Sequence, residues 1–207
     1  MKRRTKTLLS VAAVLVWTLF VCYPNPVPFF ASIGRYRRFP IDPSVAKLLR
    51  VPVPDRPERI EKLVLDRLVP YASDWRVYQM PWYFPTPQEV LRDRRGDCES
   101  RAILLASLLR AKGIPFEMEA SLTHIWVDYP GKPKNPVENE NVRYFVRDQK
   151  GYHFRWPRAL RMGEFLRFQK ESLWDIAPLS RKLLLVLGWV GLPLAVFAAR
   201  PTAGRRV

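Results

Sequence analysis

A cysteine in the middle of the chain, Cys98, has the sequence context of a nucleophile. It follows Gly96-Asp97 directly and stands in the first turn of a predicted helix. A thiol at a helix N-terminus lies in the positive end of the helix dipole, which favours the thiolate, the nucleophilic form. We therefore expect a lowered pKa at Cys98 and attack on carbonyl groups. The alternative is a small buried cysteine with only a packing role.

A cysteine nucleophile needs a base, and the chain offers only His124 and His153. His124 lies in the run 122–129, which is rich in β-branched and aromatic residues and is typical of a strand. A histidine on such a strand is often structural. Together with a capped cysteine upstream, it predicts a thiol–imidazole dyad of Cys98 and His124.

The helix that carries Cys98 has a start, a buried face and a stop in the sequence. Asp97 is a natural N-cap, because its carboxylate can accept the free backbone N–H groups of the first turn. Gly113 can take the left-handed conformation that ends a helix, and Pro115 prevents continuation. Apolar residues at three- and four-residue spacing predict one buried face: Ala102, Leu105, Ala106, Leu108 and Leu109.

These segments together resemble a known family. Gly96-Asp97-Cys98 on a leucine-rich helix, Gly113-Ile114-Pro115, and then His124-Ile125-Trp126-Val127-Asp128 are similar to the transglutaminase-like superfamily of papain-type thiol enzymes. The resemblance covers residues 87–151, about a third of the chain. It implies an α+β fold with the cysteine helix packed on an antiparallel sheet.

The resemblance also implies roles for the two residues. Cys98 would be the nucleophile, His124 the base, and an aspartate on the next strand would orient the histidine. The implied chemistry is acyl transfer, either hydrolysis of a peptide or isopeptide bond or transfer to an amine. No substrate is named by the resemblance.

The chain has no plain equivalent of the aspartate that the resemblance implies as the third catalytic residue. If Tyr129 pairs with Arg143 across the intervening loop, the antiparallel register places Asp148 opposite His124. We therefore predict Asp148 as the orienting residue. A slip of one residue would turn its side chain to the other face of the sheet.

Asp148 has a second interpretation, as the first residue of a turn that ends at Gly151. Two loop residues are alternatives for the orienting role, because asparagine and carboxylates both serve it in thiol enzymes. They are Glu138 and Asn139.

The remaining elements follow from periodicity and punctuation. Strands are predicted at 116–120, 142–147 and 152–156, and helices at 57–69, 87–94 and within 157–180. The proline-rich range 24–57 is predicted to be an extended linker, and 58–180 the transglutaminase-like domain. The aromatic-rich stretch 71–84 is either core packing or a cleft wall. As a cleft wall, it could add Trp75, Tyr78 or Gln79 to an oxyanion hole.

Two uncharged apolar segments, 7–23 and 183–199, are each just long enough to cross a bilayer. A cleavable signal peptide is the rival interpretation of the first, but its cleavage site is poor. A buried core helix is the rival for the second, but it has no polar face. We predict two transmembrane helices flanked by the basic tails 1–6 and 200–207.

The charge distribution bears on topology and partners. The tails hold seven of the 35 basic residues, so the part between the spans carries 28 against 19 acidic residues, a net charge of +9. Basic tails favour a cytoplasmic location for both ends, which places the domain outside or in the periplasm. A basic domain at a membrane would attract anionic lipid or acidic wall polymers. No nucleic-acid-binding motif is present, so nucleic acid is not an expected partner.

Cys22 and Cys98 are the only cysteines, and Cys22 lies in a predicted span. Neither a disulfide framework nor a metal site is expected, and no cofactor is predicted. The sequence thus predicts a cysteine-dependent acyl-transfer enzyme in the inner (cytoplasmic) membrane, acting on a peptide or protein of the cell envelope. The alternative is a non-catalytic module of the same fold that binds or assembles an envelope partner.

Overall fold

The computed structural model describes residues 3–121, 123–133, 138, 145–148, 151–154 and 162–199. The chain divides into two compact units. One unit combines the two ends of the chain, Met1–Phe29 and Ala177–Val207. The other is continuous and comprises Phe30–Ile176.

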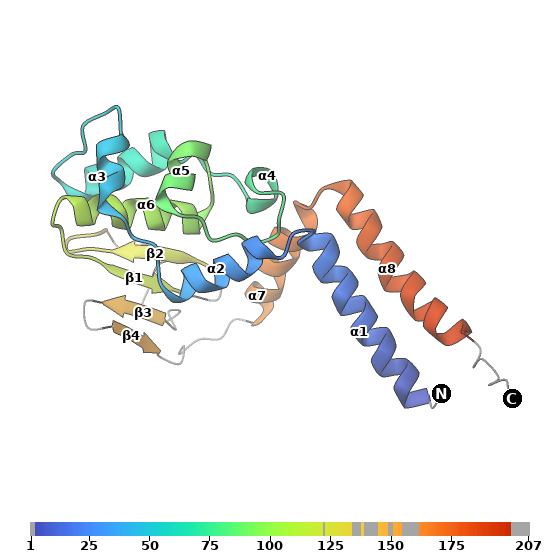
Figure 1. Ribbon diagram of the computed structural model, residues 1–207. Coiled ribbons are helices and arrows are strands. Elements are labelled where there is room, and N and C mark those ends of the chain that lie inside the picture. The colour runs from blue at the N-terminus through green and yellow to red at the C-terminus, as the bar shows by residue number, and fades with distance from the viewer. Residues whose placement is uncertain are drawn as a thin grey trace, which may run out of the picture. The chain divides into compact units, whose positions relative to one another are not determined.

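The first unit is an antiparallel pair of helices, α1 (Arg3–Cys22) and α8 (Leu179–Ala198), each 20 residues long (Figure 1). The two helices pack closely at Gly188, where an added Cβ would lie 2.0 Å from Cδ1 of Trp17. The Trp17 indole N–H donates to the Leu184 carbonyl oxygen at 2.8 Å, and that of Trp189 donates to Thr18 Oγ1 at 2.8 Å. The absence of a side chain at Gly188 is therefore what admits the Trp17 ring.

Both helices are long and apolar enough to span a membrane. Their outer faces expose large apolar side chains, as a bilayer would require: Leu8, Leu15, Leu187 and Leu194. Near one end of the pair, Lys6 Nζ donates to the Ala199 carbonyl oxygen at 2.8 Å. Near the other, Arg181 donates to the Val21 carbonyl oxygen at 2.8 Å. If the pair crosses a membrane, this antiparallel contact leaves both chain ends on the same side.

The range 24–57, predicted to be an extended linker, instead contains regular structure. Helix α2 (Val27–Arg37) and the 3₁₀ helix η1 (Pro43–Leu48) form here, and Asp42 caps η1 by accepting from the Ser44 N–H at 2.9 Å. Phe39 and Val45 are buried in the core of the second unit. The compact unit therefore begins at Phe30, not at residue 58. Prolines at the starts of short helices, such as Pro43 and Pro57, account for part of the proline-rich composition of this range.

Several short helices precede the central one: α3 (Pro57–Leu63), the π-helical turn η2 (Val64–Leu68), α4 (Asp74–Val77) and α5 (Pro87–Asp93). Helix α5 begins with the capping box that its sequence indicates. Thr86 Oγ1 accepts from the Glu89 N–H at 3.3 Å, and the Glu89 carboxylate accepts from the Thr86 N–H at 2.7 Å.

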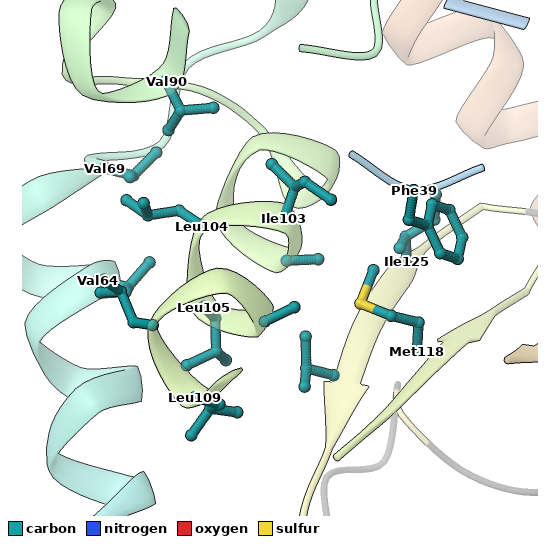
Figure 2. Close-up of a cluster of buried hydrophobic side chains, with 14 of the residues drawn as sticks. Phe39, Val64, Val69, Val90, Ile103, Leu104, Leu105, Leu109, Met118 and Ile125 are labelled. Carbon is teal, nitrogen blue, oxygen red and sulfur yellow. The ribbon is translucent and has the colours of Figure 1, made fainter. Parts of the chain in front are cut away.

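The central helix is α6 (Cys98–Ala111), and it confirms the predicted start and stop. Its burial is more extensive than one face, because every residue from Ala102 to Leu109 is buried. Figure 2 shows why: Leu104 faces Val64 of η2, Val69 directly after η2 and Val90 of α5, whereas Met118 and Ile125 approach α6 from the sheet. Helix α6 therefore lies between a helical layer and the sheet, which fixes the position of its N-terminus.

The sheet has four antiparallel strands in the order β2-β1-β3-β4. They are β1 (Glu117–Ala120), β2 (Ile125–Asp128), β3 (Phe145–Asp148) and β4 (Gly151–Phe154). Ala120 pairs with Ile125 on one side and with Phe145 on the other, so β1 separates β2 from β3. All four strands correspond to predicted ones, and β2 lies against α6 (Figure 1).

Within the range 157–180, predicted to be helix-like, the structure has α7 (Met162–Gln169) and the π-helical turn η3 (Lys170–Asp175). The second unit is thus helix-rich with one small antiparallel sheet. With the two candidate membrane helices of the first unit, this agrees with an α+β class for the domain between two spans.

Candidate active site

A cleft of about 790 Å³ opens in the second unit beside the N-terminus of α6. Cys98 and His124 both line it, although 25 residues separate them in the chain and they come from different elements. Carboxylates and aromatic rings line it as well. The cleft therefore brings together the two residues that the sequence predicts as nucleophile and base.

Cys98 is positioned by the backbone immediately before it. The Gly96 N–H donates to the Pro70 carbonyl oxygen at 3.2 Å, and the Gly96 carbonyl oxygen accepts from the Ala72 N–H at 3.0 Å. An added Cβ at Gly96 would lie 2.2 Å from Ser100 Oγ, so only glycine fits there. Asp97 then caps α6 by accepting from the Ser100 N–H at 3.5 Å. The contacts of Gly96 with residues 70–72 and the Asp97 cap together fix the position of Cys98 at the start of α6.

The Cys98 sulfur has two polar neighbours. Its thiol donates to a carboxylate oxygen of Glu99 at 2.8 Å, and the backbone N–H of Ile125 donates to the sulfur. Because Ile125 directly follows His124, this contact places Cys98 against the start of β2. Within the described part of the chain, no hydrogen bond joins the Cys98 thiol to the His124 ring.

The expectation of a lowered pKa at Cys98 is wrong for this state of the protein. Burial raises the pKa of the thiol well above its ordinary value, and the negative charges of Glu99 and Asp97 raise it further. The Ile125 N–H acts in the opposite direction but is outweighed. The helix dipole contributes only a partial positive charge, and the negative charge of the neighbouring carboxyl groups outweighs it. Cys98 is therefore a neutral thiol near pH 7.

His124 has a carboxylate partner, and it is Glu138. The His124 Nε2 atom lies 3.2 Å from Glu138 Oε1, and the His124 ring stacks on Trp126 with the ring centroids 5.7 Å apart. Lys132 Nζ lies 2.8 Å from the other oxygen of Glu138 and 3.3 Å from Glu61 Oε1. Burial opposes ionisation of Glu138, but the contacts with His124 and Lys132 outweigh it and lower the pKa of the carboxyl. Glu138 is thus held ionised beside the imidazole.

The predicted pairing that placed Asp148 opposite His124 is wrong. Met118 pairs with Arg147, so the register places Asp148 at the Glu117 end of β1. The Ser121 N–H donates to the His124 carbonyl oxygen at 2.8 Å, which places His124 at the other end. Four residues of strand correspond to about 13 Å, too far for direct contact.

The difference arises because β2 and β3, although consecutive in the chain, do not pair with each other. The strand β1 occupies the place beside β2 that was expected for β3. Asp148 instead pairs with Gly151 where β3 meets β4, in agreement with the turn interpretation. Asn139, the other alternative for the orienting role, lies outside the described residues, as does any contact that it makes.

The predicted oxyanion-hole candidates do not line the cleft. Trp75 is buried, Tyr78 is half-buried, and Gln79 is exposed with a left-handed backbone (φ 59°). From the same aromatic-rich stretch, Tyr71 and Trp82 do line it. The stretch 71–84 therefore serves partly as packing and partly as a cleft wall.

Sequence reasoning missed a cluster of three carboxyl groups around Cys98, formed by Asp74, Asp97 and Glu99. Burial and the charge of Glu99 raise the pKa of Asp74 well above its ordinary value. Burial and the charges of Glu99 and Asp74 do the same for Asp97. Asp97 and Glu99 flank Cys98 in the sequence and could have been noticed. Asp74 comes from α4 and gives no sequence signal.

This cluster predicts how stability depends on pH. Asp74 and Asp97 bind protons more tightly in the folded protein than in the unfolded chain. They therefore stabilise the fold below about pH 4, and this stabilisation is lost as the pH rises through their pKa values in the folded state. Asp97→Asn keeps an N-cap oxygen but removes one charge. We expect it to stabilise the full chain in detergent at pH 7.5. The free energy of unfolding should rise by on the order of 1 kcal/mol, and the melting temperature by a few degrees.

That advantage should shrink as the pH approaches about 4, where the wild-type carboxyl is protonated. Asp66→Asn, an exposed change outside the cleft, is the matched control and should follow the wild-type curve. An Asp97→Asn variant that is no more stable at neutral pH, or stabilised equally at every pH, would contradict the charge repulsion.

Among the described residues, no group of three His, Cys, Asp or Glu side chains has a geometry that could hold a metal ion. Comparisons of the chain with known protein families, with curated proteins and with solved structures found no match. The residues of the cleft are therefore the basis for a functional proposal.

Proposed function

We propose that this protein is a membrane-anchored cysteine acyl-transfer enzyme in which Cys98 is the nucleophile, His124 the base and Glu138 the residue that orients His124. The observation that supports it best is the ionised Glu138 beside His124, in the same cleft as a cysteine at a helix N-terminus. A carboxylate in contact with an imidazole nitrogen orients the base and stabilises the imidazolium.

In the proposed reaction the Cys98 sulfur attacks a substrate carbonyl carbon while His124 accepts the thiol proton. The backbone N–H of Cys98, at the start of α6, helps to stabilise the negative charge that develops on the carbonyl oxygen. The C–N bond of the substrate breaks, and His124 returns the proton to the leaving amine. A thioester remains on Cys98 and is released by water or by a second amine.

The raised pKa of Cys98 places a condition on this mechanism. A neutral thiol must lose its proton during the attack, so the rate depends on His124 coming within hydrogen-bond distance of the sulfur. Catalytic hydrogen bonds are often long before substrate binds and shorten in the complex. The Ile125 N–H at the sulfur already holds the backbone next to His124 against Cys98, so the movement that the mechanism requires is one of the His124 side chain.

The same proposal includes the type of core, the side of the membrane on which the cleft lies and the class of substrate. The arrangement of α6 on an antiparallel sheet is interpreted as a papain-like core. The basic tails favour a location of residues 30–176 on the outer side of the membrane, where a peptide or protein of the cell envelope would be the substrate. The positive charge of this part favours an approach to anionic lipid or wall polymer.

A specific observation favours a second candidate, a non-catalytic binding or assembly module. The Cys98 thiol donates to Glu99 and not to His124, and its surroundings disfavour the thiolate. A site kept only for packing or binding would tolerate such an arrangement. This candidate predicts no covalent chemistry at Cys98 with acyl donors.

An active ester separates the two candidates. In a Cys22→Ala background, the purified full chain in detergent is mixed with 4-nitrophenyl acetate, and nitrophenolate release and the mass of the protein are followed. The enzyme predicts rapid acetylation of Cys98 that is absent in Cys98→Ala and slowed in His124→Ala by about 100-fold or more. Equal, slow release from all variants would overturn the enzymatic proposal.

A further inference from the structure

The cleft beside Cys98 carries a charge opposite to that of the chain. The whole protein has a formal charge of +16, yet Asp74, Asp97 and Glu99 meet at the Cys98 end of the cleft. Among the described residues, none of the three makes an ion pair. Asp74 is buried and the other two are partly buried. Like charges so close together cost stability, so a ligand of opposite charge would bind there favourably.

Asp74 is the most deeply buried of the three carboxylates, and one of its oxygens lacks a partner. Its side chain is only 4% exposed, and one oxygen, Oδ2, accepts from the Tyr83 N–H at 2.7 Å. In the described structure the other oxygen, Oδ1, is buried without a hydrogen-bond partner, and the carboxyl group of Asp97 is a close neighbour of the Asp74 side chain. A carboxyl group can donate only when it is protonated. At neutral pH the Asp74–Asp97 pair therefore needs either a shared proton or an added cation.

The cations already in the cleft have other partners. The Arg101 Nε–H donates to the Val69 carbonyl oxygen at 3.0 Å, and the guanidinium lies 5.3 Å from the centre of the Tyr71 ring. Lys132 contacts Glu61 and Glu138, which places it beside His124. Neither cation is among the groups that shift the pKa of Asp74 or Asp97.

Aromatic side chains line the same cleft and supply the rest of a cation site. The Trp82 indole N–H donates to Glu99 Oε1 at 3.3 Å, which places the ring next to the carboxylates. Three other aromatic residues contribute to the lining, namely Tyr36, Tyr71 and Trp126. Carboxylates combined with aromatic rings bind ammonium and guanidinium groups, because charge pairing and cation–π attraction act together.

We propose that the carboxylates of Asp74, Asp97 and Glu99, with the ring of Trp82, form a subsite for an organic cation, an alkylammonium or guanidinium group. The cation is a recognition element and takes no part in bond making. The subsite exists whether or not Cys98 is a nucleophile. If the proposed enzymatic function holds, the substrate carries such a group close to the reacting carbonyl.

The probes are n-butylammonium and butylguanidinium, with 1-butanol as the neutral control of the same length. Binding to the full chain in detergent is measured by saturation-transfer NMR, in the Cys98→Ala background so that chemistry cannot interfere. Both cations should bind and butanol should not. Binding should weaken by about tenfold or more in Asp74→Asn and in Glu99→Gln, as the loss of one charged contact predicts.

Two further controls make the result specific. Asp66→Asn removes an exposed charge outside the cleft, and Glu61→Gln removes a carboxylate at the Lys132 side; both should bind the cations as Cys98→Ala does. Equal binding of butanol, or binding that Asp74→Asn and Glu99→Gln leave unchanged, would overturn the subsite. Because Glu99 is only partly buried, Glu99→Gln decides the matter if Asp74→Asn fails to fold.

A pair of blocked amino acids then distinguishes a peptide side chain from a free amine. Acetyl-lysine amide and acetyl-norleucine amide differ only in the ammonium group. Tighter binding of the lysine compound than of butylammonium assigns the subsite to a peptide side chain, and weaker binding assigns it to a free amine. Loss of all cation binding, while 4-nitrophenyl acetate still acylates wild-type Cys98, would remove the subsite and leave the enzymatic proposal standing.

Discussion

Glu138→Gln is expected to slow the acylation of Cys98 by about 100-fold, the scale of an impaired general base. Glutamine is of similar size and can still contact Lys132 through its oxygen. It carries no charge, however, so it no longer stabilises a protonated His124. It can also hold the imidazole in the wrong tautomer, by donating to Nε2 where the carboxylate accepts. The measurement is the nitrophenolate burst from 4-nitrophenyl acetate.

The control for this prediction is Asp148→Asn, because Asp148 is the residue that the sequence favours for the same role. With Asp148 at the opposite end of β1 from His124, its exchange should leave the burst within about twofold of wild type. Glu117→Gln provides a second control with the same chemical change at an exposed position. A large loss in Asp148→Asn with full activity in Glu138→Gln would restore the role to Asp148.

The contrast between Glu138 and Asp148 shows which features of the site local sequence can specify. The helix of Cys98 carries its own cap and stop, and the run before Asp128 has the composition of a strand, so both were predictable. The order of strands within the sheet has no such local code. Placing β1 between β2 and β3 changes the neighbours of His124 without changing any predicted strand.

The electrostatics of Cys98 could not be predicted for a similar reason. A helix N-terminus is visible in sequence, but the burial that raises the pKa of the Cys98 thiol depends on the segments that pack around the start of α6. The same applies to the beginning of the compact unit, because burial of Phe39 and Val45 is a consequence of tertiary packing. Prolines indicate where helices start as well as where linkers run, and only the packing separates the two.

The reactivity of Cys98 towards a neutral alkylating reagent should show directly that its neighbours disfavour the thiolate. With the pKa raised, the thiolate fraction of the wild-type protein is small at neutral pH. In the Cys22→Ala background, we expect the iodoacetamide rate to keep rising with pH beyond about 8.5, the ordinary range of a thiol. A rate that levels off below that pH would contradict the raised pKa.

Glu99→Gln tests the cause. The Glu99 carboxylate lies 2.8 Å from the Cys98 sulfur, and its repulsion of a thiolate in a partly buried site costs a few kcal/mol. Removing that charge should shift the rate profile to lower pH and raise the alkylation rate at pH 7.5 by about tenfold or more. Glu117→Gln, the same exchange at an exposed position, should leave the profile unchanged. If Glu99→Gln has no effect either, burial alone sets the pKa of Cys98, and the carboxylates do not control its reactivity.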